Sequence, residues 1–156
     1  MKYKVYTDGS GDVTGSRTGG WAFVLQTGDK VIKAAGFEDN STNNRMEMEA
    51  VIRALEHLTQ NYPDSKGNVE VFSDSQYVVN GASSWLEGWK AKGWRTTSGE
   101  VKNVDLWKKI DFLKSVVNPK FTWIKGHSDC EANNVCDSLA NYARENRTQI
   151  FKETLC

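Results

Sequence analysis

The hydrophobic period of this chain changes after about forty residues, and this change restricts the fold more than any other feature. Three strands with alternating or apolar side chains come first, over 2–8, 21–26 and 30–37. Short connections between such strands favour an antiparallel meander. A helical period over 44–60 and a short apolar strand over 69–73 follow, and a strand, a helix and a strand in this order indicate a parallel crossover.

The second half of the chain predicts three helices and one more strand. The expected elements are a helix over 75–92 with a break near Gly81, a helix over 103–117, a strand over 120–124 and a helix over 131–146. This order predicts an α/β fold with a mixed five-stranded sheet, three strands antiparallel and two parallel, flanked by helices. The length of 156 residues fits one domain over 1–156, in which the tail 148–156 is either ordered or flexible.

Composition excludes several classes of protein. Basic and acidic residues both number 20, so the chain does not hold nucleic acid through net charge alone. We expect no membrane association, because no apolar run approaches about 18 residues and the N-terminus lacks the core of a signal peptide. The cysteines Cys130, Cys136 and Cys156 form no paired motif, which indicates reduced thiols in a cytoplasmic protein. A zinc site built from Cys130, Cys136 and His127 does not match the usual ligand spacing.

Glu47 lies where a stable helix does not need a carboxylate. Its spacing places it on the apolar stripe that faces the sheet, with Ala50, Val51, Ala54, Leu55 and Leu58. A buried carboxylate without a partner is costly, so a partner is expected. The alternative is a capping box, with Asn44 as the N-cap and Glu47 three residues later.

Three aspartates are further candidates. Asp8 and Asp74 each end a predicted strand, and ligands of mixed α/β sheets bind beyond such ends. Asp137 borders the apolar stripe of the last helix. The alternatives are a turn residue for Asp8, a helix cap for Asp74 and a solvated flank for Asp137.

Taken together, these carboxylates indicate a metal site. If the first and fourth strands are neighbours, Asp8 and Asp74 converge, and Glu47 points at the same sheet. Clustered carboxylates need cations, and hard oxygen ligands suit Mg²⁺ or Mn²⁺. Two such ions about 4 Å apart can activate a water and stabilise the leaving oxygen in phosphodiester hydrolysis. His127 could move protons or loosen a metal after cleavage, and its alternative is exposed polar surface.

Five motifs, in order, resemble those of bacterial-type ribonuclease H of type 1. They are Thr7-Asp8-Gly9-Ser10, the segments 42–47, 73–78 and 101–107, and Trp123-Ile124-Lys125-Gly126-His127 followed by Cys136-Asp137. The resemblance runs from about Lys2 to Ala143. It implies the ribonuclease H-like fold, a substrate-binding protrusion at about 82–102, and an endonuclease that cleaves the RNA strand of an RNA/DNA hybrid by two-metal-ion catalysis. The products would carry 5′-phosphate and 3′-hydroxyl ends.

The resemblance also implies the roles of individual residues. Asp8, Glu47, Asp74 and Asp137 match the ligands of two Mg²⁺ ions, for which Mn²⁺ can substitute, and His127 matches a catalytic histidine. The implied contacts to the hybrid are Gly9, Ser10, Gly11, Asn43, Asn44, Gln76, Trp85, Trp89, Lys92, Trp94 and Asn103. Glycines let the backbone approach RNA closely, and amides can read the 2′-hydroxyl. The alternative for the tryptophans is a small satellite core. We expect a monomer.

Two departures from the family pattern concern binding. The loop after Asp8 lacks the usual proline-containing stretch, and residues 85–109 hold six basic and three acidic side chains, a net charge of +3. This modest charge predicts looser, more salt-sensitive binding than a strongly basic relative would show. Two alternatives stand beside a free-standing enzyme. One is a non-catalytic hybrid-binding module on the same fold, and the other is a detached ribonuclease H domain of a reverse transcriptase or related DNA-processing enzyme.

Overall fold

The first three strands form the predicted antiparallel meander. The structure, a computed structural model, describes residues 1–11, 17–125 and 131–155. The meander consists of β1 (Tyr3–Gly11), β2 (Gly19–Thr27) and β3 (Lys30–Glu38). β1 continues past its predicted end at Asp8, because Gly9, Ser10 and Gly11 pair with the start of β2. The glycine-rich segment therefore contributes strand as well as loop.

The parallel part of the sheet lies on the other side of β1. After α1 (Asn43–Asn61), β4 (Val69–Ser73) pairs with β1 in parallel, and β7 (Lys120–Trp123) pairs with β4 in parallel. The β1–β4 ladder ends at the pair of Thr7 and Ser73. Asp8 and Asp74 directly follow this last pair. The first and fourth strands are therefore neighbours, which is the condition for these two aspartates to converge.

The strand count differs from the prediction. Within the described residues the main sheet has six strands, in the order β7-β4-β1-β2-β3-β8, rather than five. The additional strand, β8 (Ile150–Leu155), comes from the tail and pairs antiparallel with β3. All of its residues except Ile150 are exposed, so β8 is held by its pairing with β3 and not by a buried apolar face. This part of the tail is therefore ordered.

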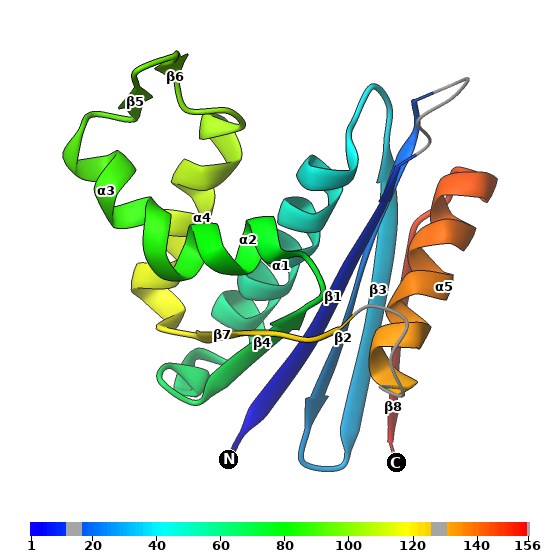
Figure 1. The fold of residues 1–156 in the computed structure, drawn as a ribbon. Coiled ribbons are helices and arrows are strands. Elements are labelled where there is room, and N and C mark those ends of the chain that lie inside the picture. Colours follow the sequence, from blue (N-terminus) through cyan, green and yellow to red (C-terminus); the bar gives the residue numbers. More distant parts are fainter. Residues whose placement is uncertain (12–16, 126–130, 156) are drawn as a thin grey trace.

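Helices cover both faces of the sheet (Figure 1). α1 lies on one face with α4 (Val104–Val117) packed against it, and α5 (Glu131–Asn146) lies on the other face. Alternate strand residues enter two apolar clusters, such as Val5 on the α1 side and Val24 on the α5 side. The position of a residue along β1 therefore decides which helix its side chain faces.

The predicted helix over 75–92 is interrupted at Gly81, as expected. α2 (Gln76–Asn80) passes into a π-helical turn (Gly81–Trp85) and then into α3 (Leu86–Ala91). A Cβ at Gly81 would fall on the ring of Trp107, so glycine lets this turn lie against α4. The short strands β5 (Arg95–Thr96) and β6 (Gly99–Glu100) follow.

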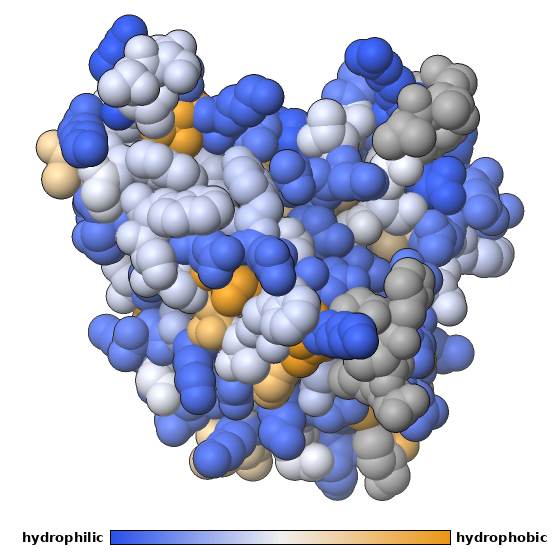
Figure 2. Space-filling view, viewed as in Figure 1, coloured by the Kyte–Doolittle hydropathy of each residue, from blue (hydrophilic) through white to orange (hydrophobic). Residues whose placement is uncertain are grey.

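We call residues 82–102 the protrusion, since they stand apart from the sheet in Figure 1. The surface in the same view is mostly hydrophilic. It has a hollow at the top of the view, between the protrusion and the upper end of the sheet (Figure 2). Among the helices that the structure describes, none has the length and apolar character needed to span a membrane.

Candidate active site

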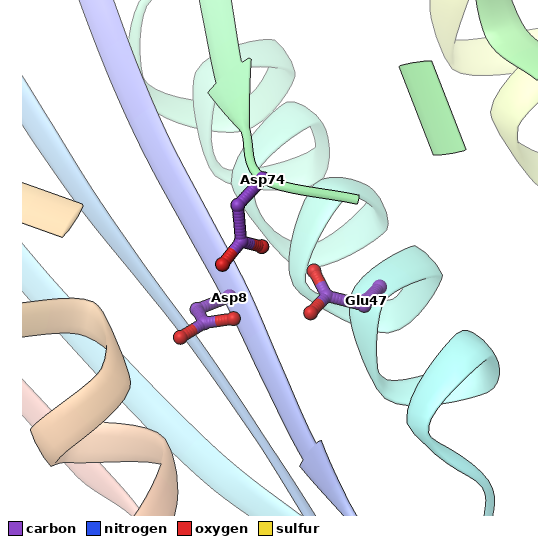
Figure 3. Close-up of side chains that lie close together, drawn as sticks. All are labelled: Asp8, Glu47 and Asp74. Atoms are coloured by element: carbon purple, nitrogen blue, oxygen red, sulfur yellow. The ribbon is translucent and has the colours of Figure 1, made fainter. Parts of the chain in front are cut away.

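Three carboxylates from separate elements meet where the β1–β4 ladder ends. Asp8 belongs to β1, Asp74 directly follows β4, and Glu47 lies in the early part of α1. One carboxylate oxygen from each lies within 4.8 Å of the other two, and the three side chains point toward one another in Figure 3. The convergence predicted from the order of the strands is confirmed for these three residues.

The capping and turn alternatives for these carboxylates are wrong. Thr42 is the N-cap of α1, because its side-chain oxygen accepts a hydrogen bond from the Arg45 backbone N–H. Ser75 caps α2 in the same way, accepting from the Val78 N–H. Asp8 pairs with Ala22 inside a strand rather than forming a turn. The three carboxylates are therefore not explained by helix capping or turn formation.

Glu47 is buried almost as deeply as Asp8 and approaches the cluster from the helix side. Its side chain is buried, and its Oε2 atom has no hydrogen-bond partner in the described part of the chain. An acceptor left unpaired in this way costs stability unless a ligand satisfies it. This free oxygen fits a bound cation or a donor from a ligand.

Gly9 and Gly11 explain how Glu47 comes so close to β1. A Cβ at Gly9 would fall on the backbone nitrogen of Glu47, and a Cβ at Gly11 would lie 2.6 Å from the side-chain oxygen of Asn43. Both glycines therefore allow the first turns of α1 to rest on the strand. Their expected approach to RNA stays a prediction.

Burial and mutual repulsion disturb the ionisation of this cluster. The pKa of Asp8 is raised from 3.8 to about 7, chiefly by burial and also by the negative charges of Asp74 and Asp137, against the lowering effect of hydrogen bonds from Glu47 and Gly9. Burial, followed by the charge of Asp8, raises the pKa of Glu47 well above its usual 4.5. Divalent cations would relieve this repulsion, and all-oxygen ligands suit hard ions. The residues present therefore fit Mg²⁺ or Mn²⁺.

Asp137 reaches the same cavity from the opposite face of the sheet. The cavity has a volume of about 340 Å³. Its lining residues are Asp8, Gly9, Asn43, Asn44, Glu47, Asp74, Ser75, Asn133, Asn134 and Asp137. Asp137 lies on α5 and is half-buried, so it is not simply a solvated flank. The cavity thus joins all four predicted carboxylates to the predicted contacts Gly9, Asn43 and Asn44.

Other predicted contacts lie outside this cavity. The Ser10 hydroxyl donates to Asn141, 2.5 Å away. Asn103 donates to the Tyr77 hydroxyl and accepts from Arg45, so its amide supports the packing beside α4. Gln76 is exposed at the start of α2. Contact of these residues with a hybrid stays a prediction.

The tryptophans of the protrusion divide between the two roles considered. Trp89 and Trp94 pack against the main core, as the satellite-core alternative expects, whereas Trp85 is 42% exposed. A groove of about 440 Å³ beside them is lined by Ser84, Trp85, Gly88, Trp89, Lys92, Arg95, Thr96 and Thr97. An aromatic ring and two cations are thus exposed together on this surface.

The remaining predictions concern His127 and two of the cysteines. His127 and Cys130 lie outside the described residues, so the catalytic histidine and the rejected zinc site are not placed. Cys136 is buried against β1, with its thiol 3.2 Å from the Tyr6 carbonyl.

Sequence reasoning missed Ser75, Asn133 and Asn134 as cavity residues. Asn133 is almost fully buried, and its side-chain oxygen has no partner among the residues described. Its position one helical turn before Asp137 is a signal that could have identified it, because residues four apart share a helix face.

Comparison with known proteins agrees with this geometry. The family model described as RNase H matches residues 1–145. A curated protein of Ruthia magnifica subsp. Calyptogena magnifica, named Ribonuclease H, is 41% identical over 145 residues, which cover 92% of this chain and 96% of that protein.

Two solved structures are also similar. LC9-RNase H1, described as a type 1 RNase H with the type 2 active-site motif, has a TM-score of 0.86 and 26% identity, covering 97% of this chain and 77% of that one. LC11-RNase H1, solved in complex with an RNA/DNA hybrid, has a TM-score of 0.71 and 27% identity, covering 93% and 98%. With the family model spanning most of the sequence, the chain belongs to the ribonuclease H family.

Proposed function

We propose that the chain is an endonuclease that hydrolyses the RNA strand of RNA/DNA hybrids. The observation that carries this proposal is the meeting of Asp8, Glu47 and Asp74 within 4.8 Å, with Asp137 on the wall of the same cavity. Support for the substrate class comes from the relative that was solved with an RNA/DNA hybrid. A binding module would not need several carboxylates whose repulsion costs stability.

The four carboxylates would hold two Mg²⁺ ions, with Mn²⁺ as a substitute. Asp8 and Asp137 would share one ion, and Asp8, Glu47 and Asp74 the other. Bound there, the pair of ions supplies a lowered pKa for the attacking water and positive charge beside the leaving oxygen. Asp8 is assigned to both ions because its side chain is close to Glu47 and Asp74 and because the charge of Asp137 also acts on its carboxylate.

The proposed reaction forms a bond between a water oxygen and phosphorus and breaks the bond from phosphorus to the 3′ oxygen. The products are a 5′-phosphate and a 3′-hydroxyl, and the leaving oxygen takes up a proton. His127 is proposed to carry a proton or to assist product release, since a histidine can change charge near neutral pH.

Recognition would involve two surfaces. Asn43 and Asn44 line the cavity, where amide groups can hydrogen-bond the 2′-hydroxyls that distinguish RNA from DNA. The exposed ring of Trp85 and the cations of Lys92 and Arg95 line the groove of the protrusion. An aromatic ring there can pack on a deoxyribose, and the cations can pair with phosphates.

The test is cleavage of an RNA/DNA hybrid labelled on each strand, with Mg²⁺ and with a chelator, beside single-stranded and duplex RNA. We expect cutting of the RNA strand of the hybrid alone, and only with metal. End analysis should find 5′-phosphate and 3′-hydroxyl groups. Tight hybrid binding without cutting in Mg²⁺ or Mn²⁺ would favour the non-catalytic module instead.

A further inference from the structure

Asp137 differs from the other three carboxylates in how it is brought to the cavity. Asp8 and Asp74 come from paired strands, and Glu47 from the helix that joins the two halves of the sheet. Asp137 comes from α5, on the opposite face, and its place depends on how α5 lies along β1. A small shift of this helix would move Asp137 away from Asp8.

The spacing of residues on β1 and α5 matches in a way that fixes this alignment. Asp8 and Ser10 are two residues apart on one strand, about 6.8 Å along it, and their side chains share the face that α5 covers. Asp137 and Asn141 are four residues apart on one helix face, about 6 Å along its axis. A contact between Ser10 and Asn141 therefore sets Asp137 beside Asp8.

That contact is present and is part of a network. The Ser10 hydroxyl donates to Asn141 Oδ1 at 2.5 Å. Arg144 donates from Nε to Ser10 Oγ at 3.1 Å and from Nη2 to Asn141 Oδ1 at 3.2 Å. Asn141 Nδ2 in turn donates to Asp137 Oδ1 at 3.5 Å. The network runs from an arginine through an amide to the fourth carboxylate.

The donors and acceptors of this network leave one orientation for the amide. A guanidinium has donors only, so the Asn141 atom that faces Arg144 is the oxygen. Ser10 accepts from Arg144 and so directs its own proton to that same oxygen. The Asn141 nitrogen then faces Asp137, whose ionised carboxylate only accepts. All these contacts are part-buried, which limits competition from water.

We propose that Asn141, oriented by Arg144 and Ser10, is a positioning residue that holds the Asp137 carboxylate toward Asp8. This inference rests on the proposed function, because it takes Asp137 as a metal ligand. Residues that hydrogen-bond a ligating carboxylate typically change metal affinity or activity by about 10–100-fold when they are removed. The long contact between Asn141 and Asp137 places the expected effect at about tenfold.

The competing explanation is that the network only fastens α5 to the sheet. Arg147 offers a matched control, because it fastens the end of the same helix without approaching Asp137. It forms a two-point ion pair with Asp39, at 2.7 and 3.0 Å, and its guanidinium lies 5.0 Å from the ring centre of Phe37. Its loss should weaken the attachment of α5 and leave the cavity unchanged.

The experiment measures Mn²⁺ binding by titration calorimetry in the full chain without nucleic acid. Asp137→Asn defines the binding that depends on the fourth carboxylate. Asn141→Ala is expected to weaken this binding about tenfold, Arg144→Ala less, and Arg147→Ala less than twofold. Because Arg144 acts through Asn141, the double variant Asn141→Ala/Arg144→Ala should bind no more weakly than Asn141→Ala. Hybrid cleavage by Asn141→Ala should show a lower kcat with KM nearly unchanged.

Each result decides between the two explanations. Equal Mn²⁺ affinity in Asn141→Ala and Arg147→Ala overturns the positioning role, while a loss confined to Asn141→Ala and Arg144→Ala supports it. If Asn141→Ala does not fold, the Arg144→Ala and Arg147→Ala pair gives the same comparison. Unchanged binding in Asp137→Asn removes the ligand assignment itself, which is a failure of the proposed function and is visible separately.

Discussion

The carboxylate cavity and the protrusion differ in burial and in the sign of their charge. The cavity gathers four like charges, of which Asp8 and Glu47 are buried, whereas the protrusion presents Trp85 at 42% exposure and a modest excess of cations. The cavity is assembled from two strands and helices on both faces of the sheet. The protrusion is a local excursion between α2 and α4. The side chains proposed to do chemistry are therefore held by several elements of the fold, whereas the side chains proposed to bind the hybrid lie on an accessible surface.

The sharpest way to break this comparison is to remove one charge from the cavity. Asp74→Asn keeps the shape of the side chain and deletes a proposed ligand charge, so we expect cleavage to fall by at least about a thousandfold. Hybrid binding should stay within about threefold, because the surface of the protrusion is untouched. Single-turnover cleavage and a binding titration in Ca²⁺ or without metal measure the two effects. Near-normal cleavage by Asp74→Asn would remove the metal assignment.

The cavity should also cost stability when no metal is present, and this cost should depend on pH. Because the pKa of Asp8 rises from 3.8 to about 7 on folding, the folded state retains a proton that the unfolded state loses between these values. Stability of the metal-free protein should then fall as pH rises through this window. Asp8→Asn removes the penalty and should gain up to about 4 kcal/mol at pH 8, and little at pH 4.

Urea unfolding in a chelator at both pH values measures this difference. Asp64→Asn is the matched control, because Asp64 is exposed in the turn before β4, whereas Asp74 follows the other end of that strand. A gain at pH 4 that equals the gain at pH 8 would show that charge repulsion is not its source.

The protrusion should respond in binding and not in chemistry. Trp85→Ala removes the exposed ring and should raise KM for the hybrid about tenfold, with kcat changed less than threefold, since base or sugar packing on an aromatic ring is worth about 1–3 kcal/mol. Phe112→Ala is a control, because Phe112 is also exposed and lies on α4 away from the groove. Equal effects of both substitutions would remove the assignment of the groove as a binding surface.

The order of elements in the sequence was enough to predict the centre of the cavity. Asp8 and Asp74 had to converge once β1 and β4 were neighbours, and the helical stripe placed Glu47 against the same sheet. Both conclusions follow from the hydrophobic period and from the order of the strands and helices, which can be read from the sequence. The family resemblance added the roles that spacing alone left open, and the family itself is confirmed.

What the sequence did not predict depends on contacts between distant segments. β8 is nearly all exposed, so only its pairing with β3 reveals it. The alignment of α5 depends on close packing, since a Cβ at Gly20 would fall on the carbonyl oxygen of Ala140. No hydrophobic period specifies such an approach, and the hydrogen bonds of Ser10 and Asn141 follow from it.

The smallest expected effect concerns the charge of the protrusion. Lys92 lines the groove and is exposed, so its proposed partner is a phosphate of the hybrid. Lys92→Ala should raise KM about threefold near physiological salt. It should also reduce the slope of log affinity against log salt by about 0.7–0.9, the value for one lost phosphate contact. Lys66→Ala, an exposed lysine in the turn before β4, should leave the slope unchanged. A flat salt dependence in the unmodified chain would instead mean that phosphate pairing contributes little, and that aromatic packing and the amides of the cavity carry recognition.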